Sequence, residues 1–391
     1  MKVTFIHTSD WHIGLTRWFL EGEAQARYSD DRIRVAEKLV ELATEKAADF
    51  IVCAGDVFDS NNLSVGALGR AREALKRLPV PVYLLPGNHD PLDASYKLDA
   101  INTEGVHVLR DSSPVMVDGR SDVEVVGAPL MSKHLLGDPA QGALTDLGRV
   151  ASGRARILVA HGQVVARSDD QAGAIIDLDG LERAVDNRIV DYVALGDTHS
   201  TTRLSSTGRV WFSGCPEATD FREVPGLGGE KNSGNVLVVT VTVDGDNSTV
   251  EVEEVPVGRW RFDAITRELR SSEDVETFLA ELSAYPDKAR TAIKYWLTGA
   301  VEMADYARLE QGLEEFGEIF AALYPRKRDE TLTVYPSDAE IDNLALTAFA
   351  RAAVDELREG ARSGDPNVAQ VDSDALKLLY RLASGRTNDA H

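Results

Sequence analysis

Two polar side chains, Asp10 and His12, follow the apolar run Val3–Ile6 near the start of the chain. Residues that are two apart project to the same side of an extended backbone. An oxygen donor and a nitrogen donor directed at one point indicate a metal site. The pair alone is a weak signal, and it gains weight only if other apolar runs end in the same way.

Four further apolar runs also end in short loops that contain Asp, Asn or His. These loops follow the runs 50–54, 82–85, 156–160 and 192–195, and their polar residues are Asp56, Asp59, Asn88, His89, Asp90, His161, Asp197 and His199. Open α/β sheets bind ligands beyond the carboxyl ends of their strands. We therefore expect the five loops to converge on one site.

The donor types in these loops suit a pair of divalent ions. Carboxylate and amide oxygens together with imidazoles favour manganese, iron or zinc. Two such ions about 3.5–4 Å apart clamp the attacking and leaving oxygens of a phosphoryl group, and a carboxylate must bridge them. Gly55, Gly87 and Gly196 open three of the loops, where a residue without Cβ lets the backbone turn sharply and approach the ions.

Alternating elements must position these loops in the first half of the chain. The spacing of apolar residues predicts helices over Asp31–Ala47 and Val65–Leu78. The runs between them are apolar throughout, which predicts strands covered on both faces, as in α/β proteins. A hairpin turn is predicted at Asp244–Asn247. The predicted strands are Val3–Ile6, Phe50–Ala54, Val82–Leu85, Val123–Val126, Arg156–Ala160, Tyr192–Leu195, Val210–Phe212, Val236–Val243 and Val250–Val255.

The pattern changes near Pro256–Gly258, which predicts a first domain over residues 1–257. Residues 258–336 predict a small α+β domain, and residues 337–391 predict C-terminal helices with a disordered tail from Gly385. The elements predicted after the boundary are the helices Ser272–Ala284, Tyr306–Phe316 and Ser373–Ala383, the strands Ala292–Thr298 and Thr331–Tyr335, and a capping box at Ser337–Glu340.

Composition limits the class of protein. The chain has 391 residues, of which 43% are hydrophobic, so a folded protein with substantial cores is expected. We expect no signal peptide and no membrane span. The two cysteines form no disulfide framework, which favours a cytoplasmic location. A net charge of −22 argues against nucleic-acid binding through a broad basic surface, but divalent ions can offset carboxylates locally, so a nuclease remains open. We find no P-loop motif.

The five loops in this order resemble the calcineurin-like metallophosphoesterase superfamily. Within it, the segments HTSDWHIG, GDVFDS, PGNHD and WFSGCPEATDFRE are similar to the SbcD-type DNA repair nucleases. The motifs cover Met1 to Glu223, and the remainder matches in layout only. The resemblance implies a four-layer αββα sandwich, a small α+β capping domain and C-terminal helices that dock an ATPase partner.

The resemblance also implies roles for particular residues. One ion would be held by Asp10, His12, Asp56 and His199, and the other by Asn88, His161 and Asp197, with Asp56 bridging the two. His89 would be a catalytic residue that assists the leaving oxygen or stabilises the transition state. The family has a histidine where this chain has Asp197, so that residue is either a ligand or a neighbour that orients one. Cys215 is expected to be a small buried residue near the site.

Three functions are open at this point. The first is a DNA nuclease of double-strand-break repair that uses two metal ions, expected to be Mn²⁺, and acts as a homodimer with an SbcC-like coiled-coil ATPase. The second is a phosphodiesterase or phosphatase for a small substrate such as a cyclic nucleotide, which the acidic net charge favours. The third is a non-catalytic scaffold, for which Asp197 is the one supporting feature.

Overall fold

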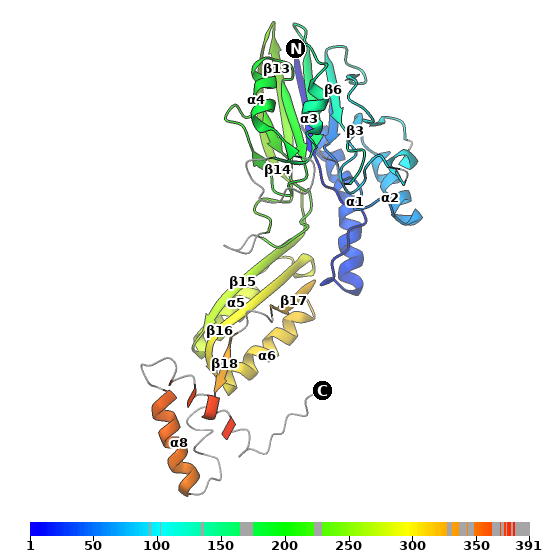
Figure 1. The fold of residues 1–391 in the computed structure, drawn as a ribbon. Coiled ribbons are helices and arrows are strands. Elements are labelled where there is room, and N and C mark those ends of the chain that lie inside the picture. Colours follow the sequence, from blue (N-terminus) through cyan, green and yellow to red (C-terminus); the bar gives the residue numbers. More distant parts are fainter. Residues whose placement is uncertain are drawn as a thin grey trace. The chain divides into compact units, whose positions relative to one another are not determined.

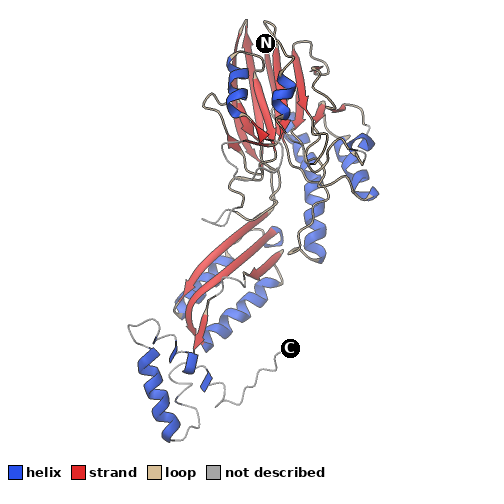
Figure 2. Cartoon of the chain, viewed as in Figure 1, coloured by secondary structure: helices blue, strands red, loops and turns tan. Residues whose placement is uncertain are grey.

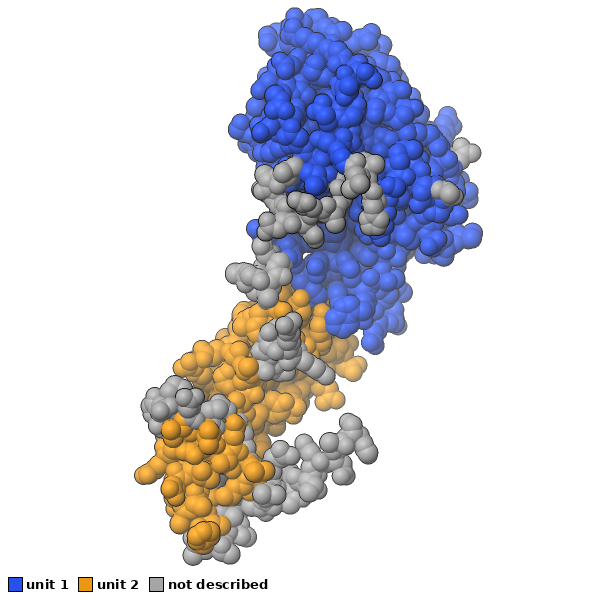
Figure 3. All heavy atoms as spheres, viewed as in Figure 1, with its two compact units in different colours: residues 1–262 blue, residues 263–391 orange. Residues whose placement is uncertain are grey.

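The computed structural model describes all residues except 94, 102, 134–136, 165–174, 223–228, 327–330, 336–341, 343–347, 362–367, 369–370, 373, 377 and 380–391. The chain forms two compact units, Met1–Phe262 and Asp263–His391 (Figure 3). The three-part division at residues 257 and 336 stays a prediction. The predicted capping box and disordered tail lie outside the described residues.

The first unit contains, within its described residues, two six-stranded sheets (Figures 1 and 2). The first sheet has the order β14 (Asn247–Pro256), β13 (Asn235–Asp244), β1 (Lys2–Thr8), β2 (Phe50–Cys53), β3 (Val82–Leu84) and β4 (Val106–Val108). The second has the order β11 (Thr202–Arg203), β12 (Val210–Phe212), β10 (Tyr192–Gly196), β7 (Ala155–His161), β6 (Val123–Ala128) and β5 (Val115–Met116).

Helices cover the outer faces of these sheets. Alternate residues of β2 face opposite ways: Phe50 and Val52 pack between the two sheets, whereas Ile51 and Cys53 pack against α1 (Gly22–Glu45) and α2 (Val65–Leu75). On the second sheet, α3 (Pro139–Leu144) and α4 (Leu178–Asp186) cover the corresponding outer face. The predicted four-layer αββα fold is confirmed, and burial on both faces explains why the strands are apolar throughout. Smaller elements of this unit are the 3₁₀ helix Leu98–Ile101 and the paired strands β8 (Gln163–Val164) and β9 (Ile175–Ile176).

Helix α1 begins at Gly22, earlier than the predicted start at Asp31. Its first turns are polar, so they carry little apolar periodicity. Tyr28 nevertheless is fully buried there and donates a 2.7 Å hydrogen bond to the carbonyl of Ala218. A tertiary contact that the local pattern does not reveal therefore stabilises the extra turns.

The second unit packs helices on one sheet, in which β17 and β18 run parallel to β16. The sheet has the order β15 (Arg261–Leu269), β16 (Thr291–Glu302) and β17 (Ala322–Pro325), and β18 (Thr333–Tyr335) also pairs with β16. The helices α5 (Ser272–Ser283) and α6 (Met303–Gly317) share its apolar core. A 3₁₀ turn, Lys288–Arg290, precedes β16. Strands β15 and β17 were not predicted.

Further along the chain, α8 (Ala348–Ala361) contributes Val354 to a small cluster with Leu376. The helix predicted over Ser373–Ala383 lies partly outside the described residues. Among the described helices, none combines the length and the apolar character needed to cross a bilayer. The cytoplasmic location stays a prediction.

One buried carboxylate ties the end of the first unit to its core. Glu217 is 1% exposed and accepts hydrogen bonds from the backbone amides of Arg259 (2.9 and 3.0 Å) and Trp260 (3.0 Å). Burial raises the pKa of Glu217 to about 7, against which the two amides and Arg32 act. Between about pH 4.5 and 7, Glu217 is therefore protonated in the folded protein and ionised in the unfolded chain.

The stability of this unit should consequently fall with rising pH. The contribution of Glu217 is fully present below about pH 4.5 and is lost as the pH passes about 7. At about 1.4 kcal/mol per pKa unit the change is on the order of 3 kcal/mol. We expect Glu217→Gln to flatten the decline in the free energy of unfolding between pH 5 and 8, as measured by urea denaturation. Exposed Glu251→Gln is the control, and parallel curves for Glu217→Gln and wild type would refute the assignment.

Candidate metal centre

Five strand ends bring the predicted site residues together. Asp10 and His12 follow β1, and Asp56 follows β2. The remaining residues come from three other loops, which follow β3 (Asn88 and His89), end β7 (His161) and follow β10 (Asp197 and His199). All of them lie within one network of short contacts, so the predicted convergence of the loops is observed. Their roles as ligands stay predictions.

The backbone at this site is strained. Asp10, His12, Asp56 and Asp197 have positive φ angles of 54°, 44°, 54° and 99°. Residues with a Cβ rarely adopt this conformation, and it costs energy that surrounding contacts must supply. Gly87 shows why some positions exclude a side chain, because a Cβ there would lie 2.1 Å from Oδ1 of Asp56.

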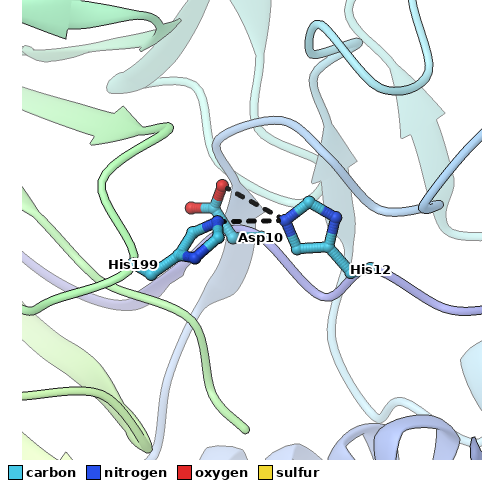
Figure 4. A group of neighbouring side chains, drawn as sticks. All are labelled: Asp10, His12 and His199. Carbon is cyan, nitrogen blue, oxygen red and sulfur yellow. Dashed lines mark hydrogen bonds and ion pairs between the residues drawn. The ribbon is translucent and has the colours of Figure 1, made fainter. Parts of the chain in front are cut away.

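The first group of donors consists of Asp10, His12 and His199 (Figure 4). One donor atom from each lies within 4.8 Å of the others. The Nε2 atoms of His12 and His199 face each other at 3.3 Å, and Nε2 of His12 is 3.9 Å from Oδ1 of Asp10. Asp56 joins this group, since its Oδ2 lies 3.9 Å from the same Nε2.

The second group of donors surrounds His161. Its Nε2 lies 2.8 Å from Oδ1 of Asn88, 3.4 Å from Oδ2 of Asp56 and 3.7 Å from Oδ1 of Asp197. Turning the Asn88 amide over would let its nitrogen donate to Asp56 and His161 instead. A cation bound between these groups would favour the orientation in which the Asn88 oxygen faces the cluster.

Each of the three histidines turns Nδ1 away from the cluster and towards an acceptor. Nδ1 of His161 donates to the carbonyl of Ala54 at 2.8 Å, which leaves Nε2 unprotonated in the neutral ring. Nδ1 of His12 faces Oδ1 of Asp59 at 3.5 Å. Nδ1 of His199 lies 2.6 Å from the Thr219 hydroxyl. With the proton on Nδ1 in each ring, the three Nε2 lone pairs would point into the cluster, the arrangement that metal-ligating histidines adopt.

His89 lies beside the donors and is more accessible than they are. Its backbone amide donates to Oδ1 of Asp56 at 2.9 Å, and its Nδ1 donates to the carbonyl of Asp59 at 2.8 Å. The side chain is 36% exposed, whereas that of His12 is 3% exposed. The ring therefore stands where a substrate can reach it.

Asp90, the last residue of the same loop, is fully buried. Its carboxylate accepts hydrogen bonds from the backbone amides of Phe58 (3.0 Å) and Gly87 (2.8 Å). It thereby joins the loop that carries Asp56 to the loop that carries Asn88.

Burial and charge oppose each other within the cluster. Burial raises the pKa of Asp197, and the carboxylates of Asp10 and Asp56 add to the effect. Burial also disfavours the charged forms of Asp56 and His161, yet each stabilises the other. The pKa of Asp56 therefore lies below its usual range and that of His161 well above. A cation can take the place of the His161 proton, so the residues present fit a divalent metal.

A buried guanidinium that the sequence analysis missed holds the first loop. Arg32, in α1, is 1% exposed, and its Nε donates to the carbonyls of Trp11 (3.0 Å) and His12 (3.2 Å). Its Nη1 donates to the carbonyl of Ala218 at 3.2 Å. A signal for this role was present, because Tyr28, Arg32, Val35 and Leu39 form one helical stripe with a charge inside it.

Cys215 is fully buried, and burial raises the pKa of its thiol well above the usual value. Its Sγ contacts the carbonyl of His199 at 3.4 Å. The thiol therefore lies close to the site in a form that resists ionisation.

The αββα sandwich carries its donor cluster at the strand ends, and this combination defines the class of fold. The calcineurin-like phosphoesterase family model matches residues 3–227, and the chain belongs to this family. The superfamily predicted from the motifs is thereby confirmed.

Curated relatives narrow the similarity. The chain is 23% identical to the DNA double-strand break repair protein Mre11 of Methanosarcina acetivorans over 97% of this chain and 61% of that protein. It is 29% identical to the SbcD component of the SbcCD nuclease of Rhodobacter capsulatus, over 56% of this chain and 63% of that protein. It is 25% identical to an uncharacterized metallophosphoesterase, YhaO, of Bacillus subtilis, over 52% and 50%. The chain thus spans between half and two thirds of these relatives, and the predicted resemblance to SbcD-type proteins is confirmed.

If the cluster holds divalent ions, they should stabilise the first unit. A ligand at about 100 times its dissociation constant adds about 2.7 kcal/mol to the free energy of unfolding. We expect Mn²⁺ to raise the melting temperature of the wild type and a chelator to reverse the rise, as measured by differential scanning calorimetry. Asp56→Asn should abolish most of the rise because it weakens both donor groups.

The matched control for this experiment is Asp118→Asn, which alters an exposed carboxylate paired with His107. This variant should respond to Mn²⁺ as the wild type does. An equal rise in Asp56→Asn would show that the ions bind elsewhere.

Proposed function

We propose that the chain is a metal-dependent phosphodiesterase that cleaves DNA in double-strand-break repair. The observation that carries the proposal is the position of Asp56, whose Oδ2 lies 3.9 Å from Nε2 of His12 and 3.4 Å from Nε2 of His161. One carboxylate thus lies between two groups of donors, as a bridging ligand of a two-metal centre would. Support for DNA as substrate comes from the relatives named as a double-strand break repair protein and as part of a nuclease.

The proposed ligands form two sets. Asp10, His12, Asp56 and His199 would hold one ion, and Asp56, Asn88, His161 and Asp197 would hold the other. Two divalent ions, for which we propose Mn²⁺, would activate water and neutralise charge on the phosphate oxygens. The protein's own part is to fix these donors on strand ends and to keep the Nε2 atoms unprotonated.

His89 is proposed to act on the substrate rather than on a metal. Its Nδ1 is held by the carbonyl of Asp59, so its Nε2 is left for the phosphate or the leaving oxygen. When the ring is doubly protonated, Nε2 can donate a proton or a hydrogen bond as negative charge develops on that oxygen. The exposed face of the ring is one part of the centre that a DNA strand can approach.

The partners proposed for this activity are DNA, a second copy of this chain and an SbcC-like coiled-coil ATPase. The name of the Rhodobacter relative, one component of an SbcCD nuclease, supports the ATPase. The net charge of −22 supports a need for such help, because an acidic chain attracts DNA weakly without a partner or bound cations.

A second candidate is a phosphodiesterase or phosphatase for a small phosphorylated substrate such as a cyclic nucleotide. The same acidic charge favours it, since a small substrate needs no extended basic surface. The relative that is named a metallophosphoesterase without a stated substrate is compatible with this candidate.

Assays of wild type and His89→Ala on two substrates test the proposed function against the second candidate. In the presence of Mn²⁺ we expect wild type to cleave both end-labelled duplex DNA and bis-p-nitrophenyl phosphate. His89→Ala should lose about 10²- to 10⁴-fold in kcat on DNA, the range for loss of a general acid or base. His107→Ala, which removes a partly exposed histidine paired with Asp118, should retain full activity.

Cleavage of the small diester alone, with or without an added ATPase partner, would favour the second candidate. Mn²⁺ binding without cleavage of either substrate would contradict both candidates. Full activity of His89→Ala on DNA would overturn the role assigned to the histidine.

A further inference from the structure

A buried carboxylate is linked to one donor histidine through a hydroxyl group. Nδ1 of His199 lies 2.6 Å from Oγ1 of Thr219, and that hydroxyl in turn contacts Oε1 of Glu230. Glu230 Oε1 also lies 3.4 Å from the same Nδ1. The three groups therefore form a chain that leads from the metal cluster to an acid outside it.

The proton positions in this chain follow from the chemistry of its ends. A carboxylate can only accept, so the Thr219 hydroxyl donates its proton to Glu230. The lone pairs on the hydroxyl oxygen then accept from His199, whose Nδ1 must carry a proton. In the neutral imidazole this leaves Nε2 bare, and Nε2 is the atom that faces His12 in the cluster.

The acid is held rigidly in place. Glu230 is 4% exposed and Thr219 is 1% exposed. The carboxylate also accepts from the backbone amides of Thr219 (3.0 and 3.3 Å) and Asp220 (3.0 Å), while the Glu230 amide donates to the carbonyl of Phe221 at 2.9 Å. Backbone and side chain of Glu230 thus both fasten the segment that presents the hydroxyl.

The three histidines of the centre are held by different acceptors. His161 uses a backbone carbonyl, and His12 faces the carboxylate of Asp59. For His199 the acceptor is a hydroxyl, which would have no fixed direction without Glu230. An amide or water on the other side could turn the hydroxyl proton towards His199 and favour the opposite tautomer.

We propose that Glu230 and Thr219 are positioning residues that keep His199 in the tautomer with a proton on Nδ1, so that its Nε2 binds a metal ion. The inference rests on the proposed function, because it assigns a purpose to a ligand of that centre. Loss of the Thr219 hydroxyl should therefore weaken the binding of one ion and leave the other ion bound. Neither residue would touch the substrate.

Three variants test the link. Thr219→Val keeps the shape of the side chain and removes the hydroxyl, Thr219→Ser restores the hydroxyl, and Glu230→Gln removes the charge. Thr201→Val is the matched control, since Thr201 is a buried threonine whose hydroxyl donates to the carbonyl of Ser213 at 2.6 Å and, among the described residues, hydrogen-bonds to no histidine. Melting curves establish that each variant is folded.

The first readout is the tautomer itself. Long-range ¹⁵N–¹H spectra of the metal-free protein distinguish a protonated Nδ1 from a protonated Nε2, and the His199 signals are assigned by their loss in His199→Asn. We expect Nδ1–H in wild type, Thr219→Ser and Thr201→Val, and a mixture of tautomers in Thr219→Val. Unchanged Nδ1–H in Thr219→Val would overturn the proposal.

The second readout is the affinity for Mn²⁺, measured by calorimetry and by the electron paramagnetic resonance signal of free Mn²⁺. We expect Thr219→Val and Glu230→Gln to weaken one of the two binding steps by about 10- to 100-fold, the range for loss of a group that orients a ligand. Thr219→Ser should bind as wild type does. Equal affinity in all variants would overturn the proposal.

The two proposals fail in distinguishable ways. If wild type binds no Mn²⁺, the metal centre of the proposed function is wrong, and the tautomer measurement still decides the positioning role. If wild type binds two ions and Thr219→Val does the same with unchanged affinity, the metal centre stands and the positioning role falls.

Discussion

The crowding of acceptors at one buried point is the constraint on which the rest of the first unit depends. Carboxylates and unprotonated imidazole nitrogens repel each other where water cannot screen them. Here Nε2 of His12 and Nε2 of His199 stand 3.3 Å apart, and the pKa of His161 is raised well above its usual value by the acids around it. Such an arrangement persists only if the fold holds it in place or, as we propose, a cation fills it.

Arg32 is the main means by which the fold holds it. Its guanidinium donates to the carbonyls of Trp11 and His12 in the loop after β1 and to that of Ala218 near Thr219. Trp11 and His12 are far from Ala218 in the sequence. One side chain of α1 therefore aligns two separate segments of the centre. Without Arg32 the carbonyls of His12 and Ala218 would keep the Leu15 amide and the Tyr28 hydroxyl as donors, whereas the buried carbonyl of Trp11 would be left unpaired at a cost of about 1–3 kcal/mol. This contact helps to sustain the left-handed backbone at Asp10 and His12.

Much of the fold of the first unit could be predicted from the sequence. The strands that carry the loops are buried on both faces, so their apolar runs are unbroken. Strand β15 was missed because its buried apolar residues, Phe262, Ile265 and Leu269, are spaced as on a helix face. The loop residues could be predicted by type and position. The contacts of Glu230 with Thr219 and His199 could not, since they join residues that only the folded chain brings together and that carry no spacing rule.

Asp197 shows how far the two donor groups differ. Under the proposed assignment one ion would have two imidazoles and two carboxylates, and the other one imidazole with three oxygen donors. Carboxylate and amide oxygens suit harder ions such as Mn²⁺ or Mg²⁺, whereas imidazoles also suit zinc and iron. An aspartate where the resemblance implies a histidine therefore shifts the second group towards oxygen-preferring ions and adds a negative charge beside Asp10 and Asp56. The raised pKa of Asp197 reflects this added repulsion as well as burial, and a bound cation would relieve it.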